Sequence, residues 1–329
     1  MEAADLGNRL SRADFLVIGR AGMDLSAEPP GTAAEHALAF SASLGGSSAN
    51  IAAGLCKLGA RAALVTCVSD DSVGRFALNQ LDHYGVDRTH VRTVGGEFRN
   101  SLAIYESRLA KFQNTIYRNG AADFQMTVED IDGVDFTAHS ALVTTGTVFA
   151  AEPSRSATFH AFDRAKTAGL PIIFDIDYRP YSWTSAAEAS EVITRAGRAS
   201  DIIVGNDEEF DFMAGEAGAG LDMARRMAAD HAAIVVYKMG PEGAITFAGG
   251  EETRTGVYRV DALKPVGAGD AFMAGFLSAL AEGQGVGRAV LRGSASAAIT
   301  VTRPGCAPAI PTPDELDAFI LDHPGPSEV

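Results

Sequence analysis

Short apolar runs rich in Val and Ile recur along the chain, and amphipathic segments rich in Ala, Glu and Arg separate them. Continuous apolar runs of this length are typical of strands buried on both faces of a parallel sheet. The segments between them have the composition of helices. This alternation predicts βαβ units, and therefore an α/β fold whose central, mostly parallel sheet is covered by helices on both faces. The expected strands are Phe15–Ile18, Ala63–Val68, Ala141–Val143, Ile172–Phe174, Ile202–Val204 and Ile234–Val236, and the clearest helices are Ser154–Ala168, Ala186–Ala199 and Leu221–Ala229.

One region breaks this alternation. Ser101–Glu106 and Lys111–Arg118 alternate apolar and polar residues around a short polar turn, which is the pattern of an exposed antiparallel hairpin. Residues Leu25–Phe40 are not helical in character either. We therefore expect one domain over residues 1–329, with a small β lid formed by segments near 25–44 and 97–120. An ordinary edge hairpin is the alternative.

The composition limits the classes of partner. The chain has 329 residues, 47% of them hydrophobic, which is enough for a large core, and a net charge of −15 that disfavours nucleic acid. An ATP site in so acidic a chain needs local positive potential from helix N-termini, Lys, Arg or Mg²⁺. The three cysteines show no metal-ligand spacing, no secretion signal precedes the first strand, and no apolar run is long enough to span a bilayer. We expect a cytoplasmic protein with no membrane partner.

The most informative stretch is the glycine-rich turn that precedes the predicted helix Asp270–Glu282. The backbone amides of Gly267, Ala268 and Gly269 can point into one concavity at the helix N-terminus, which would stabilise negative charge on a phosphoryl group. Asp270 beside it could accept the proton of an attacking hydroxyl. Phosphoryl transfer depends mainly on such positioning and charge stabilisation. The simpler interpretation is an ordinary helix start, with Asp270 as a favourable first-turn acid.

A second glycine pair opens the apolar helix Ile51–Leu58. Gly45 and Gly46 would let the backbone approach a ligand, and Asn50 offers both a donor and an acceptor. The alternative is a plain loop in which Ser48 is the helix N-cap.

Two aspartates follow expected strands. Asp24 comes after the first strand, and Asp177 comes after Ile172–Ile176. Ligands of open α/β sheets bind beyond the carboxyl ends of the strands, so both could bind hydroxyl groups. Otherwise, both are turn aspartates.

Candidates for the nucleotide side follow two later strands. Asn206 and Glu209 are three residues apart, a spacing that favours a helix capping box, although the pair could also hold Mg²⁺ through water. Lys238 and Gly240 end another strand and suit nucleotide phosphates or ribose, unless the lysine is merely exposed.

Two arginines could clamp an acidic acceptor. Arg118 lies in the expected hairpin, and Arg179 follows Asp177. A guanidinium binds a carboxylate through two parallel hydrogen bonds. Most isolated arginines, however, are surface charges.

Taken in order, the motifs GGSSAN, NDEE, KMG and GAGD resemble the ribokinase (PfkB) family of carbohydrate kinases, from about Phe15 to about Ile320. The segments IGRAGMDL, YRNGAAD, TTGTVFAAEPSR, DIDYRPYSW and GSASAAITVTRPG are similar to its 5-dehydro-2-deoxygluconokinase subfamily. The resemblance implies ATP-dependent phosphorylation of the C6 hydroxyl of 5-dehydro-2-deoxygluconate, a step of bacterial myo-inositol catabolism.

The resemblance also implies a ribokinase-like fold, ATP and Mg²⁺ as cofactors, a sugar acid as acceptor, and a homodimer formed through the lid. It implies Asp270 as the base, with Gly267, Ala268 and Gly269 in the anion hole. It implies further that Asn206 and Glu209 position Mg²⁺. The remaining implied positions are Asn206, Lys238, Gly240, Gly243, Ser294 and Ala297 for the nucleotide, and Asp24, Gly45, Gly46, Asn50, Arg118, Asp177 and Arg179 for the acceptor.

One position departs from the family pattern. Many members carry an acidic residue six positions before the base, associated with a monovalent-cation site, and this chain has Lys264 there. Val266 also replaces a usual small hydroxyl residue. The departure puts a bound K⁺ in doubt, and the hypothesis is that the Lys264 ammonium takes part of its electrostatic role.

Other functions stay open at this point. The same chemistry could act on 2-keto-3-deoxygluconate, fructose or a nucleoside. A non-catalytic regulatory protein that binds sugar or nucleotide could use the same scaffold, although the intact Asp270 argues against it. A nucleotide-binding oxidoreductase is disfavoured, because only Gly19 and Gly22 of a GxGxxG pattern are present.

Overall fold

The computed structural model describes residues 3–107, 113–323 and 325–326. Its main element is a nine-stranded sheet in the order β13-β12-β11-β10-β9-β8-β1-β4-β5. Neighbouring strands from β5 to β11 are parallel, whereas β12 and β13 are antiparallel to their neighbours. Every strand expected from an apolar run is confirmed, as β1, β4, β8, β9, β10 and β11. The bounds are β1 Asp14–Ile18, β4 Arg61–Ser69, β5 Val91–Val94, β8 Ala141–Thr145, β9 Ile172–Asp175, β10 Ile202–Asn206, β11 Ile234–Lys238, β12 Ala244–Ala248 and β13 Glu251–Thr255.

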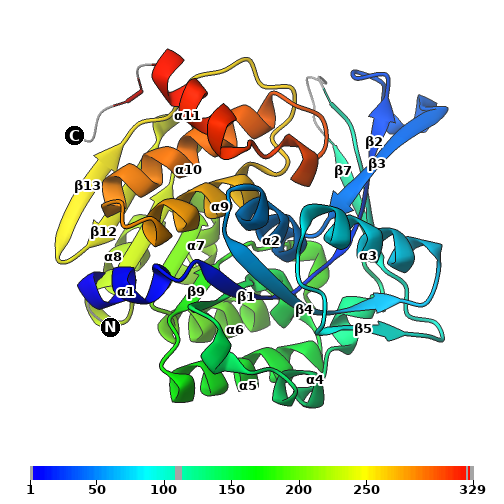
Figure 1. The fold of residues 1–329 in the computed structure, drawn as a ribbon, viewed down its shortest axis with the longest axis horizontal. Helices are drawn as coiled ribbons and strands as arrows, with labels where there is room; N and C mark the ends of the chain where they lie inside the picture. The colour runs from blue at the N-terminus through cyan, green and yellow to red at the C-terminus, as the bar shows by residue number, and fades with distance from the viewer. Residues whose placement is uncertain (1–2, 108–112, 324, 327–329) are drawn as a thin grey trace.

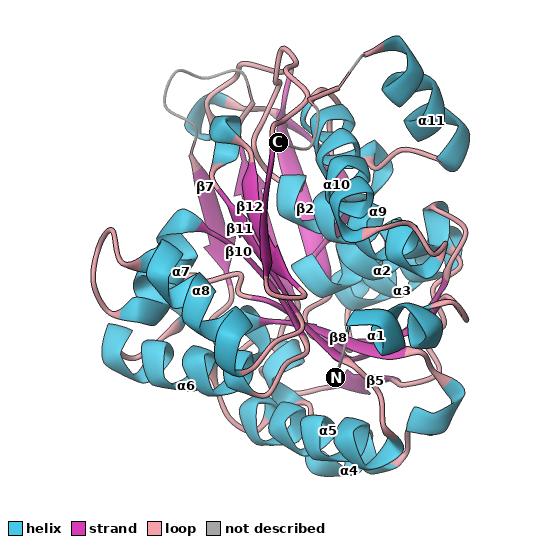
Figure 2. Ribbon diagram, turned by 90° about the vertical axis from the view of Figure 1, so that its left-hand side faces the viewer, coloured by secondary structure: helices cyan, strands magenta, loops and turns pink. Residues whose placement is uncertain are grey.

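Helices cover both faces of this sheet, which explains why its strands are apolar without alternation (Figure 2). On β10, Ile202 and Val204 belong to one buried cluster, and Ile203 between them belongs to the other. The predicted α/β fold is therefore confirmed. One layer contains α1 Ala3–Leu10, α2 Ser47–Lys57, α3 Ser72–Tyr84, α9 Ala268–Ala281, α10 Val286–Val301 and α11 Pro313–Asp322, and the other contains α4 Val128–Asp132, α5 Ser154–Ala168, α6 Ala186–Arg198, α7 Asp207–Ala214 and α8 Gly220–Asp230.

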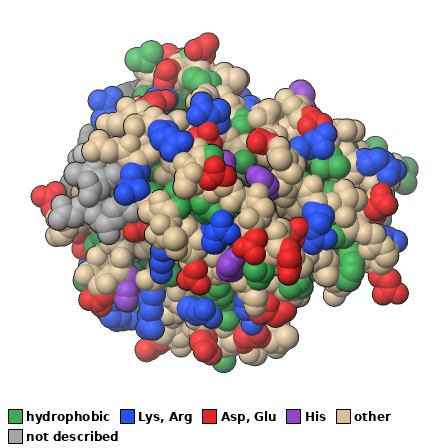
Figure 3. Space-filling model, turned by 60° about the horizontal axis from the view of Figure 1, so that its bottom comes forward, with side chains coloured by type: hydrophobic (Ala, Val, Ile, Leu, Met, Phe, Trp, Pro, Cys, Tyr) green, Lys and Arg blue, Asp and Glu red, His purple; other side chains and the backbone are tan. Residues whose placement is uncertain are grey.

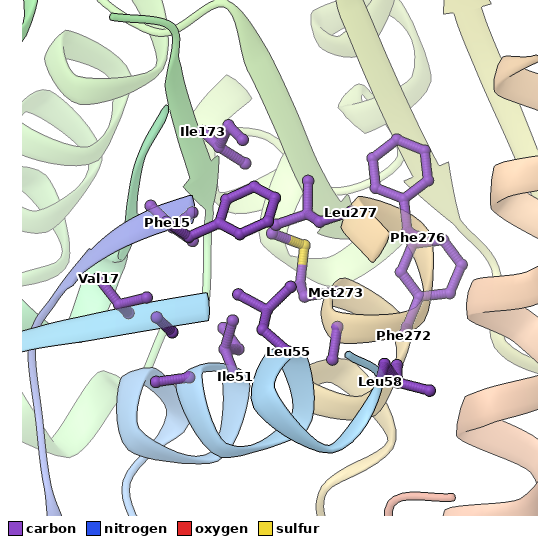
Figure 4. Close-up of a cluster of buried hydrophobic side chains, with 14 of the residues drawn as sticks. Phe15, Val17, Ile51, Leu55, Leu58, Ile173, Phe272, Met273, Phe276 and Leu277 are labelled. Carbon is purple, nitrogen blue, oxygen red and sulfur yellow. The ribbon is translucent and has the colours of Figure 1, made fainter. Parts of the chain in front are cut away.

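The helices α2 and α9 pack together against β1 (Figure 4). Phe15, Ile51, Leu55 and Met273 are fully buried in this cluster. Each such side chain contributes about 1.5–3 kcal/mol to folding through burial. The cluster therefore holds the two helices firmly beneath the site described below.

A second, four-stranded sheet in the order β3-β2-β6-β7 stands apart from the first. Figure 1 shows β2 and β3 reaching away from the body of the molecule. The hairpin expected from the sequence is present as the antiparallel pair β6 and β7, although Lys111 and Phe112 of its expected second strand lie outside the described residues. β2 starts close after β1 ends, so the small sheet begins at the carboxyl edge of the large one. Its strands are β2 Gly22–Glu28, β3 Ala39–Gly45, β6 Ser101–Tyr105 and β7 Asn114–Tyr117.

Charges of both signs are interspersed on the face drawn in Figure 3, with no continuous basic area on that face. Such a surface offers little attraction to a phosphate backbone. None of the helices in the described part of the chain combines the length and the apolar character that crossing a bilayer requires.

Candidate active site

The glycine-rich turn ends at the N-terminus of α9. Gly267 is the N-cap residue, with φ +84°, and a Cβ atom there would lie 3.1 Å from Cys306 Sγ, so the backbone conformation requires glycine. Within the described residues, the N–H groups of Gly269 and Asp270 have no backbone acceptor, and that of Ala268 has only a long contact of 3.4 Å to a carbonyl. Free amides at the start of a 14-residue helix form a site that attracts anions.

Asp270 lies in the first turn of α9, and Asn50 Nδ2 donates a hydrogen bond to its Oδ2 at 2.8 Å. Desolvation raises the pKa of Asp270 to about 7, and the negative charge of Asp177 adds to the effect. A carboxyl group with a pKa near neutrality exchanges protons readily at physiological pH. The side chain is only partly exposed, beside the free amides of its own helix.

The meeting of Asn50 and Asp270 follows from the packing of α2 on α9. A Cβ atom on Gly54 would lie 2.6 Å from the Cβ of Ala274, so the two helices approach closely at that glycine. Asn50 and Asp270 are each one turn earlier on these helices, and thus on the same faces. One turn later, Ser278 Oγ faces the carbonyl of Leu58 at 3.4 Å. The small residue at position 54 therefore sets the distance between amide and carboxylate.

The glycines before α2 serve close approach within the protein. A Cβ atom on Gly45 would lie 2.1 Å from Asp24 Oδ1, and one on Gly46 would lie 2.3 Å from the Arg20 carbonyl oxygen. The interpretation of Ser48 as N-cap is wrong, because Gly46 is the N-cap residue, with φ +96°. The hydroxyl of Ser48 instead donates to the carbonyl of Ile18 at 3.2 Å.

The two candidate aspartates differ in their partners. Asp24 is buried on β2, and burial raises its pKa to about 6 against the opposing charge of Arg20. Asp177 accepts a hydrogen bond from Ser47 Oγ at 2.7 Å and forms an ion pair with Arg179 at 2.7 Å. Asp177 thus already has two partners, whereas Asp24 has no ion pair within the described residues.

The two candidate arginines are both paired with acids. Arg118 is buried, bonds to Asp123 through Nη2, and donates to the carbonyl of Thr147 at 2.9 Å. Its guanidinium also lies 4.1 Å from the ring centre of Phe124. Arg179 is bound to Asp177, as described above. Neither guanidinium is free of a carboxylate in this structure.

Asn206 and Glu209 form the capping box that their spacing favours. Asn206 Oδ1 accepts the Glu209 N–H, and Glu209 Oε2 accepts the Asn206 N–H, both at 2.8 Å. Burial raises the pKa of Glu209, and the charge of Lys238 opposes this effect. Lys238 pairs with Asn206 across β10 and β11, and its Nζ lies 3.9 Å from the place where a Gly269 Cβ would be. The lysine therefore stands close to the free amides of α9.

The other nucleotide candidates lie on two elements. Gly240 and Gly243 form the turn between β11 and β12, with φ +54° and +96°. Ser294 and Ala297 are three residues apart on α10, hence on one face of it, and both are partly exposed. Nothing in the described contacts links them directly to the turn before α9.

Comparison with family models assigns the chain to a known family. The sequence model of the pfkB family carbohydrate kinases matches residues 12–313. The chain belongs to this family.

Similar proteins come from several bacteria. A 5-dehydro-2-deoxygluconokinase of Photobacterium profundum is 35% identical over 312 residues, which cover 93% of this chain and 94% of that protein. The crystal structure of a PfkB protein from Polaromonas sp. JS666 matches with a TM-score of 0.80 and 30% identity, over 93% of this chain and 99% of that one. A putative ribokinase II of E. coli, solved with ATP and Mg²⁺, shares the fold with a TM-score of 0.83 at 20% identity, over 94% and 99%.

In this carbohydrate kinase, one residue at the site escaped the sequence analysis. Arg20 is buried in the loop between β1 and β2, and its charge lowers the pKa of both Asp24 and Asp270. The segment IGRAGMDL contains it, but no local pattern distinguishes an arginine that turns inward from one that faces water.

Kinases of this family use ATP and a divalent metal. The described residues contain no group of three or more His, Cys, Asp or Glu side chains arranged to hold a metal ion. The carboxylate of Glu209 and the amide of Asn206 are engaged in the capping box. Because both groups are engaged, they would contact a hard cation through water. Nucleotide phosphates and water would supply most of its ligands, which is the usual mode for Mg²⁺.

Proposed function

We propose that this kinase transfers the γ-phosphoryl group of ATP to the C6 hydroxyl of 5-dehydro-2-deoxygluconate. The observation that carries the proposal is the side chain of Asp270, held by Asn50 beside the free amides of α9. The names of the relatives support the acceptor, and the family supports the chemistry. The product is the 6-phosphate, which fits a place in myo-inositol catabolism.

Asp270 acts as the general base in this proposal. Its carboxylate takes the proton of the hydroxyl, the hydroxyl oxygen bonds to the γ-phosphorus, and the electrons of the broken bond leave with ADP. The amides from Gly267 to Asp270 stabilise the charge that builds up on the transferred group. A pKa of about 7 supports this role, because a large fraction of the base is ionised at neutral pH while it still holds a proton effectively.

The acceptor binds between α2, β2 and the base. Asn50 Oδ1 is buried and has no hydrogen-bond partner within the described residues, which supports a role in receiving an acceptor hydroxyl. The Asp24 carboxylate supplies a second hydrogen-bond acceptor for the substrate. Because Gly45 and Gly46 have no side chains, the backbone can lie close to the bound acceptor there. Positions Arg118, Asp177 and Arg179 remain predictions for the same site.

The nucleotide lies on the other side of the turn. Lys238 binds its phosphates, and Gly240 and Gly243 admit its ribose, while Ser294 and Ala297 face adenine. Asn206 and Glu209 position Mg²⁺ through water, and bound Mg²⁺ neutralises phosphate charge. The nearness of Lys238 to Gly269 supports this arrangement.

Lys264 stands in for a monovalent cation. Its Nζ is buried and donates to the carbonyl of Val266 at 2.6 Å, with the carbonyl of Thr300 at 3.4 Å. An ammonium that binds main-chain carbonyls beside the turn provides the positive charge a bound K⁺ would supply there. We therefore expect little dependence of the rate on K⁺.

The small sheet serves as the lid in this proposal, closing over the acceptor to exclude water. Its edge strand β3 is exposed over residues 39–42, and Leu38, Phe40 and Tyr117 are exposed apolar side chains. An exposed apolar strand edge favours pairing, which supports a homodimer through the lid. The dependence on ATP and the three free cysteines support a cytoplasmic location.

The experiment is a coupled ADP-release assay with the purified kinase. The panel contains 5-dehydro-2-deoxygluconate, 2-keto-3-deoxygluconate, fructose and a nucleoside. We expect the highest kcat/KM with 5-dehydro-2-deoxygluconate and negligible ADP release without acceptor. If a neutral sugar gives a higher kcat/KM, that sugar replaces 5-dehydro-2-deoxygluconate as the assigned acceptor. If no compound of the panel causes ADP release, a binding or regulatory protein is favoured.

A further inference from the structure

Arg20 is a buried cation whose charge acts on the proposed base, and its guanidinium forms no ion pair with any carboxylate in the described part of the chain. Only 9% of its surface is exposed, and its Nη1 donates to Ser101 Oγ at 3.1 Å. Neither Nε nor Nη2 has an acceptor among the described residues, and Nε is fully enclosed. Leaving charged donors unsatisfied inside a protein is costly. Such an arrangement persists most readily where a ligand completes it.

The backbone of Arg20 is fixed to the site. Its carbonyl oxygen accepts the N–H of Ala49 at 3.2 Å, which ties the loop to the first turn of α2. Its side chain reaches Ser101 on β6, in the small sheet. Arg20 therefore joins both sheets, with its charge acting on Asp24 and Asp270.

The comparison with the other arginines favours Arg20. The guanidinium of Arg118 is already bound to Asp123, and that of Arg179 is bound to Asp177. A ligand carboxylate at either would share the cation with a protein carboxylate. At Arg20 it would meet a guanidinium that forms no ion pair within the described residues.

We propose that Arg20 binds the carboxylate of the acceptor and thereby selects sugar acids over neutral sugars, an inference that rests on the proposed function. Nε and Nη2 form the side of a guanidinium that binds both oxygens of a carboxylate, and the bond from Nη1 to Ser101 orients that side. One oxygen of the carboxylate bonds to Nη2, and a bond from the other oxygen to Nε requires the side chains that enclose Nε to move when the acceptor binds. The acceptor carries its carboxylate and its reacting hydroxyl at opposite ends, so one end can lie at Arg20 while the other reaches Asp270.

The test compares 5-dehydro-2-deoxygluconate with its primary amide, which keeps the shape and removes the charge. In Arg20→Met, we expect kcat/KM for the acid to fall by about 10²-fold, the scale of a lost bidentate charged pair, chiefly through KM. We expect the amide to change by less than about threefold, because it loses no ionic partner. The preference of the wild-type kinase for the acid over the amide should therefore collapse.

Two further variants separate recognition from folding. Arg20→Lys keeps the positive charge but removes the paired N–H donors of the guanidinium. We expect its kcat/KM to fall about tenfold for the acid and to stay unchanged for the amide. Arg92→Met is the matched control, because Arg92 on β5 pairs with Asp130, outside the site, and we expect the preference for the acid to persist. Calorimetric binding of ADP and the melting temperature report whether each variant is folded.

Equal losses on acid and amide in folded Arg20 variants would overturn the proposal. If Arg20→Met does not fold, Arg20→Lys decides by the same acid-to-amide ratio. If the wild-type kinase phosphorylates neutral sugars but no sugar acid, the proposed function itself is refuted. That outcome is decided by the wild-type protein alone, without any variant.

Discussion

The two sides of the turn before α9 differ in how they are built. On the proposed acceptor side, Arg20, Asp24 and Asn50 are buried polar side chains, and burial raises the pKa of Asp24 to about 6. On the proposed nucleotide side, Gly240 is exposed and Gly243 is buried at the end of the same turn, and Ser294 is a small, partly exposed residue on α10. In the proposed function, buried polar side chains therefore make up most of the acceptor side, whereas backbone turns and small residues join Lys238 and the buried Glu209 on the nucleotide side. Substitutions on the acceptor side should therefore have the larger effects.

The largest effect should come from Asp270→Asn at the boundary between the two sides. We expect kcat to fall by about 10²–10⁴-fold, the range for the loss of a general base, while ATP still binds. Steady-state kinetics and calorimetry measure the two properties. The matched control is Asp222→Asn, since Asp222 is also a first-turn acid, on α8, and should leave kcat unchanged. Equal, small effects of the two substitutions would mean that Asp270 is only a favourable helix-start residue.

Asn50→Ala comes next, because Asn50 bonds to Asp270 and, in the proposed function, receives an acceptor hydroxyl. We expect kcat/KM for the acceptor to fall by roughly 10–100-fold, as for a lost hydrogen bond to a charged group. The hydrogen bond from Asn50 lowers the pKa of Asp270, so its removal should raise that pKa and move the ascending limb of the pH–rate profile to higher pH. A limb that moves to lower pH would contradict the hydrogen bond.

Lys238→Met tests the nucleotide side. We expect KM for ATP to rise by about tenfold, the scale of one charge-assisted hydrogen bond, with KM for the acceptor little changed. Initial rates over a grid of both substrates measure the two constants. If only KM for the acceptor rises, Lys238 belongs to the acceptor site and not to the nucleotide site.

The smallest effect should come from K⁺. We expect the rate to change by less than about twofold when Na⁺ or tetramethylammonium replaces K⁺, because the Lys264 ammonium already binds the carbonyls beside the turn. Strong activation by K⁺ at constant ionic strength would rule out that role for Lys264.

The fold could be predicted because its signals are local. Each buried strand is a short apolar run, and the capping box of Asn206 and Glu209 is a spacing within one turn. The N-cap prediction for Ser48 failed because a polar side chain after a glycine pair suggests a cap, whereas the N-cap residue is Gly46, with a positive φ, and α2 starts two residues earlier than expected.

The site could be predicted only in part, because its contacts are distant in sequence. Asp177 receives a bond from Ser47, which is 130 residues away, and Asn50 meets an acid 220 residues away. Motifs indicated that Asn50 and Asp270 carry function, but not that they touch. The inward turn of Arg20 depends on Ser101 in another sheet and has no local signal.

The pH dependence of kcat/KM for 5-dehydro-2-deoxygluconate tests the central claim most directly, namely that Asp270 is a base whose pKa lies near neutrality. Only the ionised carboxylate accepts the proton, so kcat/KM should rise about tenfold per pH unit below the pKa and level off above it. The predicted result is an ascending limb with an apparent pKa of about 7. A profile already flat from pH 5 upward would contradict the account.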